Sequence, residues 1–266
     1  MNETNSTPLL RDGERIDRIN ENLRLIQPRG GLSFGTDAYL LAAFARPAPA
    51  GALVDLGAGT GVISLLCLAR GRFRHAYAAE LQETSCDVIR RNAALNGFEH
   101  RLTVLGGDVR ELNPTALPET PSAVLSNPPY LPAGAGLPCA DIRMETARRE
   151  LNGTISDFCA AAARLLPSGG GFFTVYRPER LADLFSALRA ARLEPKRMVT
   201  VYPDTDSRPC LCLVEARRDG APSLTFSPPL IIYRSAGERV YTPAMQRIYD
   251  TFSLEFLFEA RKERRL

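Results

Sequence analysis

The chain has 266 residues, of which 45% are hydrophobic and 24% are charged, and its formal net charge is +3. This is the profile of an ordinary soluble globular protein, and the length suits one α/β domain with appendages. No apolar run reaches the roughly 18 residues that a membrane helix needs, and the polar N-terminus lacks a signal-peptide pattern, so we expect a cytoplasmic protein without membrane contact.

The cysteines and histidines argue against a metal site. Six cysteines are scattered through apolar segments without a Cys-x-x-Cys pair, and there are two histidines. Zinc sites are built from closely spaced ligands of these two types. We therefore expect buried, reduced thiols and no bound metal.

Residues 1–50 are predicted to form a lead-in that packs on the core. The first 20 residues are polar and are expected to be frayed. Residues 23–26 and 32–34 flank a Pro-Arg-Gly-Gly turn, which predicts a short hairpin. Residues 37–45 follow as a helix, with Thr36 as its expected N-cap.

Residues 51–220 alternate between apolar strands and amphipathic helices and are predicted to form the main domain. The expected strands are 52–56, 76–81, 102–105, 123–126, 172–176, 198–202 and 211–216. The expected helices are 62–69, 83–96, 155–166 and 178–191. This alternation is typical of an α/β fold, in which helices cover both faces of a parallel sheet.

Residues 221–266 are predicted to form a C-terminal appendage. Residues 230–233 and 239–241 flank a Ser-Ala-Gly turn and predict a second hairpin. A helix is expected from about Pro243, followed by a basic tail that ends the chain.

The segment 54–61, VDLGAGTG, predicts a ligand-binding turn between the first core strand and its helix. Glycines at such a turn let the backbone approach a ligand that a Cβ atom would obstruct. A dinucleotide fingerprint needs a glycine five residues after Gly57, but Val62 stands there. The spacing behind an acid suits a ligand that lacks a pyrophosphate and has a positively charged amino-acid part, and the candidate binding residues are Asp55, Gly57, Ala58, Gly59 and Gly61.

Two further acids follow the next two strands. Glu80 lies 25 residues after Asp55 and is expected to accept hydrogen bonds from the hydroxyls of a ribose. Asp108 follows two glycines and is expected to accept from an adenine amino group. Because parallel strands end at one edge of a sheet, we expect both acids, with their neighbours Leu81 and Val109, to border the same site.

The segment Asn127-Pro128-Pro129-Tyr130 follows the fourth core strand and carries the predicted chemistry. An adenine amine is a poor nucleophile because its lone pair is delocalised. The side-chain oxygen of Asn127 and the carbonyl of Pro128 can accept its hydrogens, and the two prolines restrict the backbone. Tyr130 offers a ring on which a base can stack. We predict that these four residues position an exocyclic amine for methyl transfer.

The order of these motifs resembles the class I amino-methyltransferases. The chain from about residue 14 to 250 is more specifically similar to the bacterial tRNA(Val) adenine-37 N6-methyltransferase family, through residues 14–17, 25–27, 34–41, 177–181 and 229–233. The resemblance implies a Rossmann-like, seven-stranded, mostly parallel sheet whose last strand is antiparallel. It also implies S-adenosyl-L-methionine as the cofactor and an anticodon-loop adenine of tRNA as the substrate.

The same resemblance implies that Gly35, Thr36 and Asp37 help to close the cofactor site, which Asn127 also borders. Family members often have Ala-Arg-His-Glu where this chain has Ala-Arg-Arg-Glu at 147–150. That loop is expected to meet the substrate, so the departure leaves the identity of the substrate open.

Three other functions are compatible with parts of the sequence. A methyltransferase of protein glutamine side chains also uses Asn-Pro-Pro-Tyr, but such enzymes place a sizeable helical domain before the glycine turn, where this chain has about 50 residues. A guanine N2-methyltransferase of ribosomal RNA is not excluded by the turn. A non-catalytic RNA- or cofactor-binding protein is disfavoured by the intact turn at 127–130.

Overall fold

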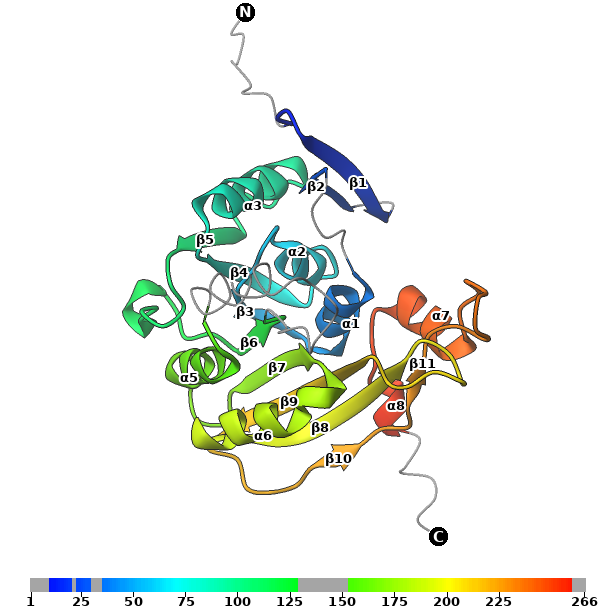
Figure 1. Cartoon of the computed structure of the whole chain (residues 1–266). Coiled ribbons are helices and arrows are strands. Elements are labelled where there is room, and N and C mark those ends of the chain that lie inside the picture. Colours follow the sequence, from blue (N-terminus) through cyan, green and yellow to red (C-terminus); the bar gives the residue numbers. More distant parts are fainter. Residues whose placement is uncertain (1–9, 21–22, 30–34, 129–152, 260–266) are drawn as a thin grey trace, which may run out of the picture.

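The computed structural model describes residues 10–20, 23–29, 35–128 and 153–259, and a sheet with helices on both faces forms its centre (Figure 1). Seven strands make up the body of this sheet. Their spatial order is β5 (Leu102–Gly106), β4 (Phe73–Glu80), β3 (Ala48–Leu56), β6 (Ala123–Ser126), β7 (Gly171–Tyr176), β9 (Leu211–Arg218) and β8 (Leu193–Tyr202). Strand β9 is antiparallel to both of its neighbours and the other pairs are parallel, so the expected seven-stranded arrangement is confirmed.

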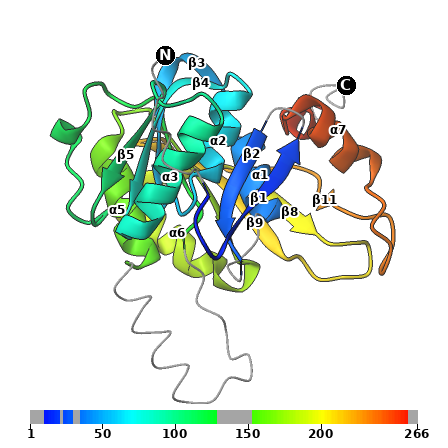
Figure 2. The same cartoon turned by 90° about the horizontal axis from the view of Figure 1, so that it is seen from above.

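The helices divide the core into two layers. Helices α1 (Thr36–Phe44), α2 (Val62–Ala69) and α3 (Glu83–Leu95) pack on one face of the sheet, and α5 (Ile155–Leu165) and α6 (Leu181–Ala190) pack on the other (Figure 2). Neighbouring residues of a strand point to opposite faces, so Phe172 enters the second core and Phe173 the first. Because helices cover both faces of the sheet, the central strands are apolar on both faces.

The N-terminal hairpin lies one strand earlier than predicted. Strand β1 (Glu14–Asn20) pairs antiparallel with β2 (Leu23–Pro28), so residues 14–20 form a strand where a frayed segment was expected. The expected pairing of 23–26 with 32–34 stays a prediction. Residues 32–34 lie outside the described part of the chain. Glu14 anchors the hairpin to α3 through an ion pair with Arg91, whose Nη2 lies 2.6 Å from Oε1. The N-cap of α1 is Gly35, without a side-chain cap, and not Thr36.

The C-terminal segment joins the main sheet. Strands β10 (Thr225–Phe226) and β11 (Leu230–Ile231) both pair parallel with β8, which brings the sheet to nine strands. The predicted hairpin is therefore reduced to one antiparallel bridge between Tyr233 and Tyr241. Helix α7 (Pro243–Thr251) begins where predicted, and α8 (Phe256–Glu259) follows it. The basic tail from residue 260 lies outside the described residues, and the domain boundaries at residues 50 and 220 stay a prediction.

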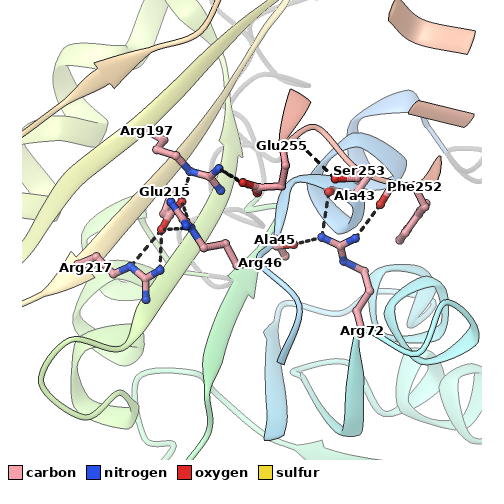
Figure 3. Close-up of polar contacts among 10 residues, drawn as sticks. All are labelled: Ala43, Ala45, Arg46, Arg72, Arg197, Glu215, Arg217, Phe252, Ser253 and Glu255. Carbon is pink, nitrogen blue, oxygen red and sulfur yellow. Dashed lines mark hydrogen bonds and ion pairs between the residues drawn. The ribbon is translucent and has the colours of Figure 1, made fainter. Parts of the chain in front are cut away.

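Several contacts attach the described part of this segment to the core, among them a ring stack and an ion pair. The ring of Tyr39 on α1 stacks on that of Tyr249 on α7, with ring centres 4.7 Å apart. Arg197 of β8 donates to Glu255, with Nη1 2.9 Å from Oε1, in a network of arginines around Glu215 (Figure 3). In the ranges that the structure covers, no helix is long and apolar enough to cross a membrane.

Candidate active site

The carboxyl ends of β3, β4, β5 and β6 meet at one edge of the sheet. Leu56 at the end of β3 pairs with Ala79 on one side and with Ser126 on the other. Glu80 at the end of β4 pairs with Gly106 of β5. The strand ends at this edge carry Glu80 and lead directly into the glycine turn, the turn at Asp108 and Asn127. Open α/β sheets bind their ligands at this edge.

The glycine turn has the left-handed backbone that its sequence predicts. Gly57, Gly59 and Gly61 have φ angles of 71°, 60° and 79°. A Cβ atom on Gly59 would meet no heavy atom within 4 Å, whereas one on Gly61 would lie 3.0 Å from a methyl carbon of Ile89. The turn therefore needs glycine for its conformation, and at Gly59 it leaves open space beside the backbone.

Glu80 braces this turn. Its side chain is largely buried, with 7% of the residue exposed. Oε2 accepts from the backbone amide of Gly59 at 2.8 Å, and Oε1 accepts from that of Gln82 at 2.9 Å. A carboxylate offers about four acceptor positions, so these two bonds are compatible with further bonds to ribose hydroxyls.

Asp55 is the next-to-last residue of β3, just before the turn, and has no exposed surface. Its Oδ2 accepts from the amide and the hydroxyl of Ser64 in the first turn of α2, at 3.2 and 2.9 Å. Among the described residues, its Oδ1 has no hydrogen-bond partner. Burial raises the pKa of this carboxyl from 3.8 to about 7. The structure thus uses Asp55 to hold the start of α2 to β3, and direct contact with a ligand stays a prediction.

Asp108 and Val109 border a cavity of about 240 Å³ beyond the ends of β4 and β5. Asp108 accepts from the backbone amide of Arg110 and from its Nε, both at 2.9 Å. These hydrogen bonds lower the pKa of the Asp108 carboxyl, so it is an ionised acceptor at neutral pH. Leu81 is one of the exposed large hydrophobic residues, at 40%, whereas Ala58 in the glycine turn is buried.

Asn127 is half-buried just after β6, beside the glycine turn. The hydroxyl of Ser126 donates to the carbonyl of Leu56 at 3.0 Å, which ties the ends of β6 and β3 together. The side-chain Nδ2 of Asn127 donates to Oδ2 of Asp37 in the first turn of α1, at 2.9 Å. Pro128 is buried, whereas Pro129, Tyr130 and the loop at 147–150 lie outside the described residues.

The bond between Asp37 and Asn127 was missed by sequence reasoning. The two residues are 90 positions apart, and only a family resemblance had placed Asp37 near the site. No local pattern predicts such a contact, because it joins the first turn of α1 to the residue that follows β6. Among the described residues, no group of three or more His, Cys, Asp or Glu could hold a metal ion.

The strand order, the antiparallel β9 and a glycine turn beside an Asn-Pro turn define a Rossmann-like methyltransferase fold. The sequence agrees: a family profile described as the methyltransferase small domain matches residues 29–191. The chain belongs to this family and is a methyltransferase.

Relatives with assigned names include two bacterial tRNA1(Val) (adenine(37)-N6)-methyltransferases. The one from Porphyromonas gingivalis is 28% identical over 229 residues, which cover 82% of this chain and 87% of the relative. The one from Klebsiella pneumoniae subsp. pneumoniae is 30% identical over 182 residues, which cover 68% and 73%. Among solved structures, a "predicted O-methyltransferase" from Agrobacterium tumefaciens superposes with a TM-score of 0.66 at 24% identity, covering 82% of this chain and 97% of that one, which shows the shared fold.

Proposed function

We propose that this protein transfers the methyl group of S-adenosyl-L-methionine to the N6 amine of an adenine in the anticodon loop of a tRNA. The observation that carries the proposal is the position of Asn127, at the end of β6 and directly beside the glycine turn of β3. An amide that accepts hydrogens from an amine is thereby held next to the turn that would bind the methyl donor. The names of the relatives support adenine 37 of a tRNA as the target.

The residues at the edge of the sheet fit this cofactor. The open space beside Gly59 admits a ligand against the backbone, and Glu80 keeps acceptor positions near it. The ionised Asp108 and the cavity beside Val109 would accept the adenine end. A bound cofactor would supply an electrophilic methyl group on a sulfonium and would leave as the neutral thioether, while the methylated amine would release one proton to solvent. The chain itself supplies binding and orientation.

The chain's own residues act mainly by positioning the amine. In the proposed complex, the side-chain oxygen of Asn127 and the carbonyl of Pro128 accept the two hydrogens of the amine and aim its nitrogen at the methyl group. A stacked base cannot reach a donor held in a cleft, so the adenine must be flipped out of its stack, which is least costly in a loop. Tyr130 is proposed as the stacking partner of the flipped base. From the proposed tRNA substrate we infer a reaction in the cytoplasm.

Separate substrate pools provide the test. The purified protein is incubated with a labelled methyl donor and with tRNA, ribosomal RNA or total protein, and digested nucleosides and amino acids are analysed by mass spectrometry. The proposal expects 6-methyladenosine from the tRNA pool. Methylglutamine from the protein pool, or N2-methylguanosine from ribosomal RNA, with unmodified tRNA adenine, would contradict it and favour one of the alternative substrates.

A further inference from the structure

The carboxylate of Asp37 bridges two parts of the fold. Its Oδ1 accepts from the backbone amide of Ala38 at 2.8 Å, which fixes the carboxylate to the start of α1. Its Oδ2 accepts from Nδ2 of Asn127 at 2.9 Å. A Cβ atom at Gly35 would lie 2.3 Å from Oδ1 of Asp37, so the N-cap glycine makes room for this side-chain conformation. The carboxylate is thus held in place before it meets Asn127.

This contact determines which way the amide of Asn127 faces. An ionised carboxylate only accepts hydrogen bonds, so it bonds the NH₂ end of an amide and repels the oxygen. The NH₂ end of Asn127 must therefore face Asp37, and the oxygen must face another direction. An amide without such a partner can turn about its last bond at little cost. Turned the wrong way, it would present a donor to a substrate amine, which is itself a donor.

We propose that Asp37 is a positioning residue, which selects the amide orientation in which Asn127 presents its oxygen to the substrate amine. The inference rests on the proposed function, in that the target is an amine. It assigns Asp37 to the substrate side of the reaction, whereas a cofactor-closing residue would act on the affinity for the methyl donor. The two roles therefore differ in what a substitution changes.

The orientation can be measured without any substrate. In protein labelled with ¹⁵N at asparagine, the Nδ2 protons of Asn127 are assigned by their loss in Asn127→Ala. We expect that Asp37→Ala shifts these resonances upfield and speeds their exchange with solvent, because a charge-assisted hydrogen bond is lost. Unchanged shifts and exchange would overturn the proposal, whatever the true substrate is.

The kinetic test separates positioning from cofactor binding and from stability. For Asp37→Ala we expect kcat on the methylated substrate to fall by about 10- to 100-fold, the scale of a hydrogen bond to a charged group. The dissociation constant for S-adenosyl-L-methionine is expected to stay nearly unchanged. Asp183→Ala is the matched control, since Asp183 is also an acid in the first turn of a helix but pairs with Arg180. It is expected to leave kcat unchanged.

A conservative variant completes the test. The side-chain oxygen of Asp37→Asn can still accept from Asn127, so this variant is expected to recover part of the kcat that Asp37→Ala loses. Loss of cofactor affinity with an unchanged kcat, or equal kcat values for Asp37→Ala and wild type, would overturn the proposal. If the wild type methylates a substrate other than tRNA adenine, the proposed function fails, while the resonances of Asn127 still report on Asp37.

Discussion

Asp55 near the end of β3 and Glu215 on β9 are both fully buried, but their surroundings differ. Glu215 is ion-paired with Arg46, Arg197 and Arg217 (Figure 3). Within the described residues, Asp55 accepts from the neutral Ser64, and the nearby Glu80 raises its pKa further.

The difference separates a structural region from a functional one. The negative charge of Glu215 is balanced by its arginine partners. One of them, Arg197, also pairs with Glu255 in the C-terminal segment. This network fastens the segment to the sheet. At the edge that carries the glycine turn, the buried Asp55 has no counter-charge among the residues that the structure covers. Such perturbed groups are typical of sites that bind or react, where stability is not the only requirement.

The largest effect is expected for Glu215→Ala. This change leaves Arg197, which is 5% exposed, without its buried partner. Removing one member of a buried pair costs about 3–5 kcal/mol in the free energy of unfolding. Urea unfolding measures it, and Glu179→Ala is the control, because Glu179 pairs with Arg177 at the surface. Equal stability of the two variants would show that the buried network does not stabilise the fold.

For Asn127→Ala we expect a loss of turnover without a loss of stability. Losing a positioned acceptor should reduce kcat by about a hundredfold or more. Stability and affinity for the methyl donor should change little, because Asn127 is half-buried and faces the substrate amine in the proposed complex. Turnover is measured with labelled donor and affinity by calorimetry. Near-normal turnover would remove Asn127 from the chemistry.

Glu80→Ala should weaken binding of S-adenosyl-L-methionine. The change removes the brace on Gly59 and a charged acceptor, each worth about 1.5–3 kcal/mol. Calorimetry measures the affinity, and Glu83→Ala is the control, because the Glu83 side chain is 76% exposed and pairs with Arg90. Equal affinity of the two variants, or tight binding of NAD in place of the methyl donor, would contradict the assigned site.

The smallest effect is a pH dependence of the free energy of unfolding, which Asp55→Asn should remove. Because the folded-state pKa of Asp55 is raised from 3.8 to about 7, the folded protein binds more protons than the unfolded chain between these values. Wild-type stability therefore falls as the pH rises through this window. From about pH 6 to about pH 8 the loss is about 1.4 kcal/mol relative to Asp55→Asn. Parallel unfolding profiles for the two proteins would contradict this account.

Most of the core could be predicted from the sequence. Helix α2 (Val62–Ala69) and strand β6 (Ala123–Ser126) have the predicted bounds. Both are apolar and are followed or preceded by glycine or proline, so local pattern and tertiary burial agree. The ends of β3, β4 and β5 also meet as expected, because parallel strands share their direction.

The features that the sequence did not predict are those whose structure depends on contacts between distant parts of the chain. Strand β1 (Glu14–Asn20) is mostly polar, and it is ordered by pairing with β2 and by the ion pair between Glu14 and Arg91. Strand β11 (Leu230–Ile231) pairs with β8 at the edge of the sheet. A hairpin pattern in the sequence does not predict this pairing. The contact of Asp37 with Asn127 likewise joins segments that are distant in sequence.

The most direct test of the proposed function is the modification of tRNA in cells. Transfer RNA is isolated from a strain that lacks this gene and from the same strain carrying the wild-type gene or Asn127→Ala. Nucleosides are then measured by mass spectrometry. We expect that 6-methyladenosine in tRNA is lost without the gene, is restored by the wild type and is not restored by Asn127→Ala. Unchanged 6-methyladenosine in tRNA, with methylglutamine lost from a protein, would contradict it.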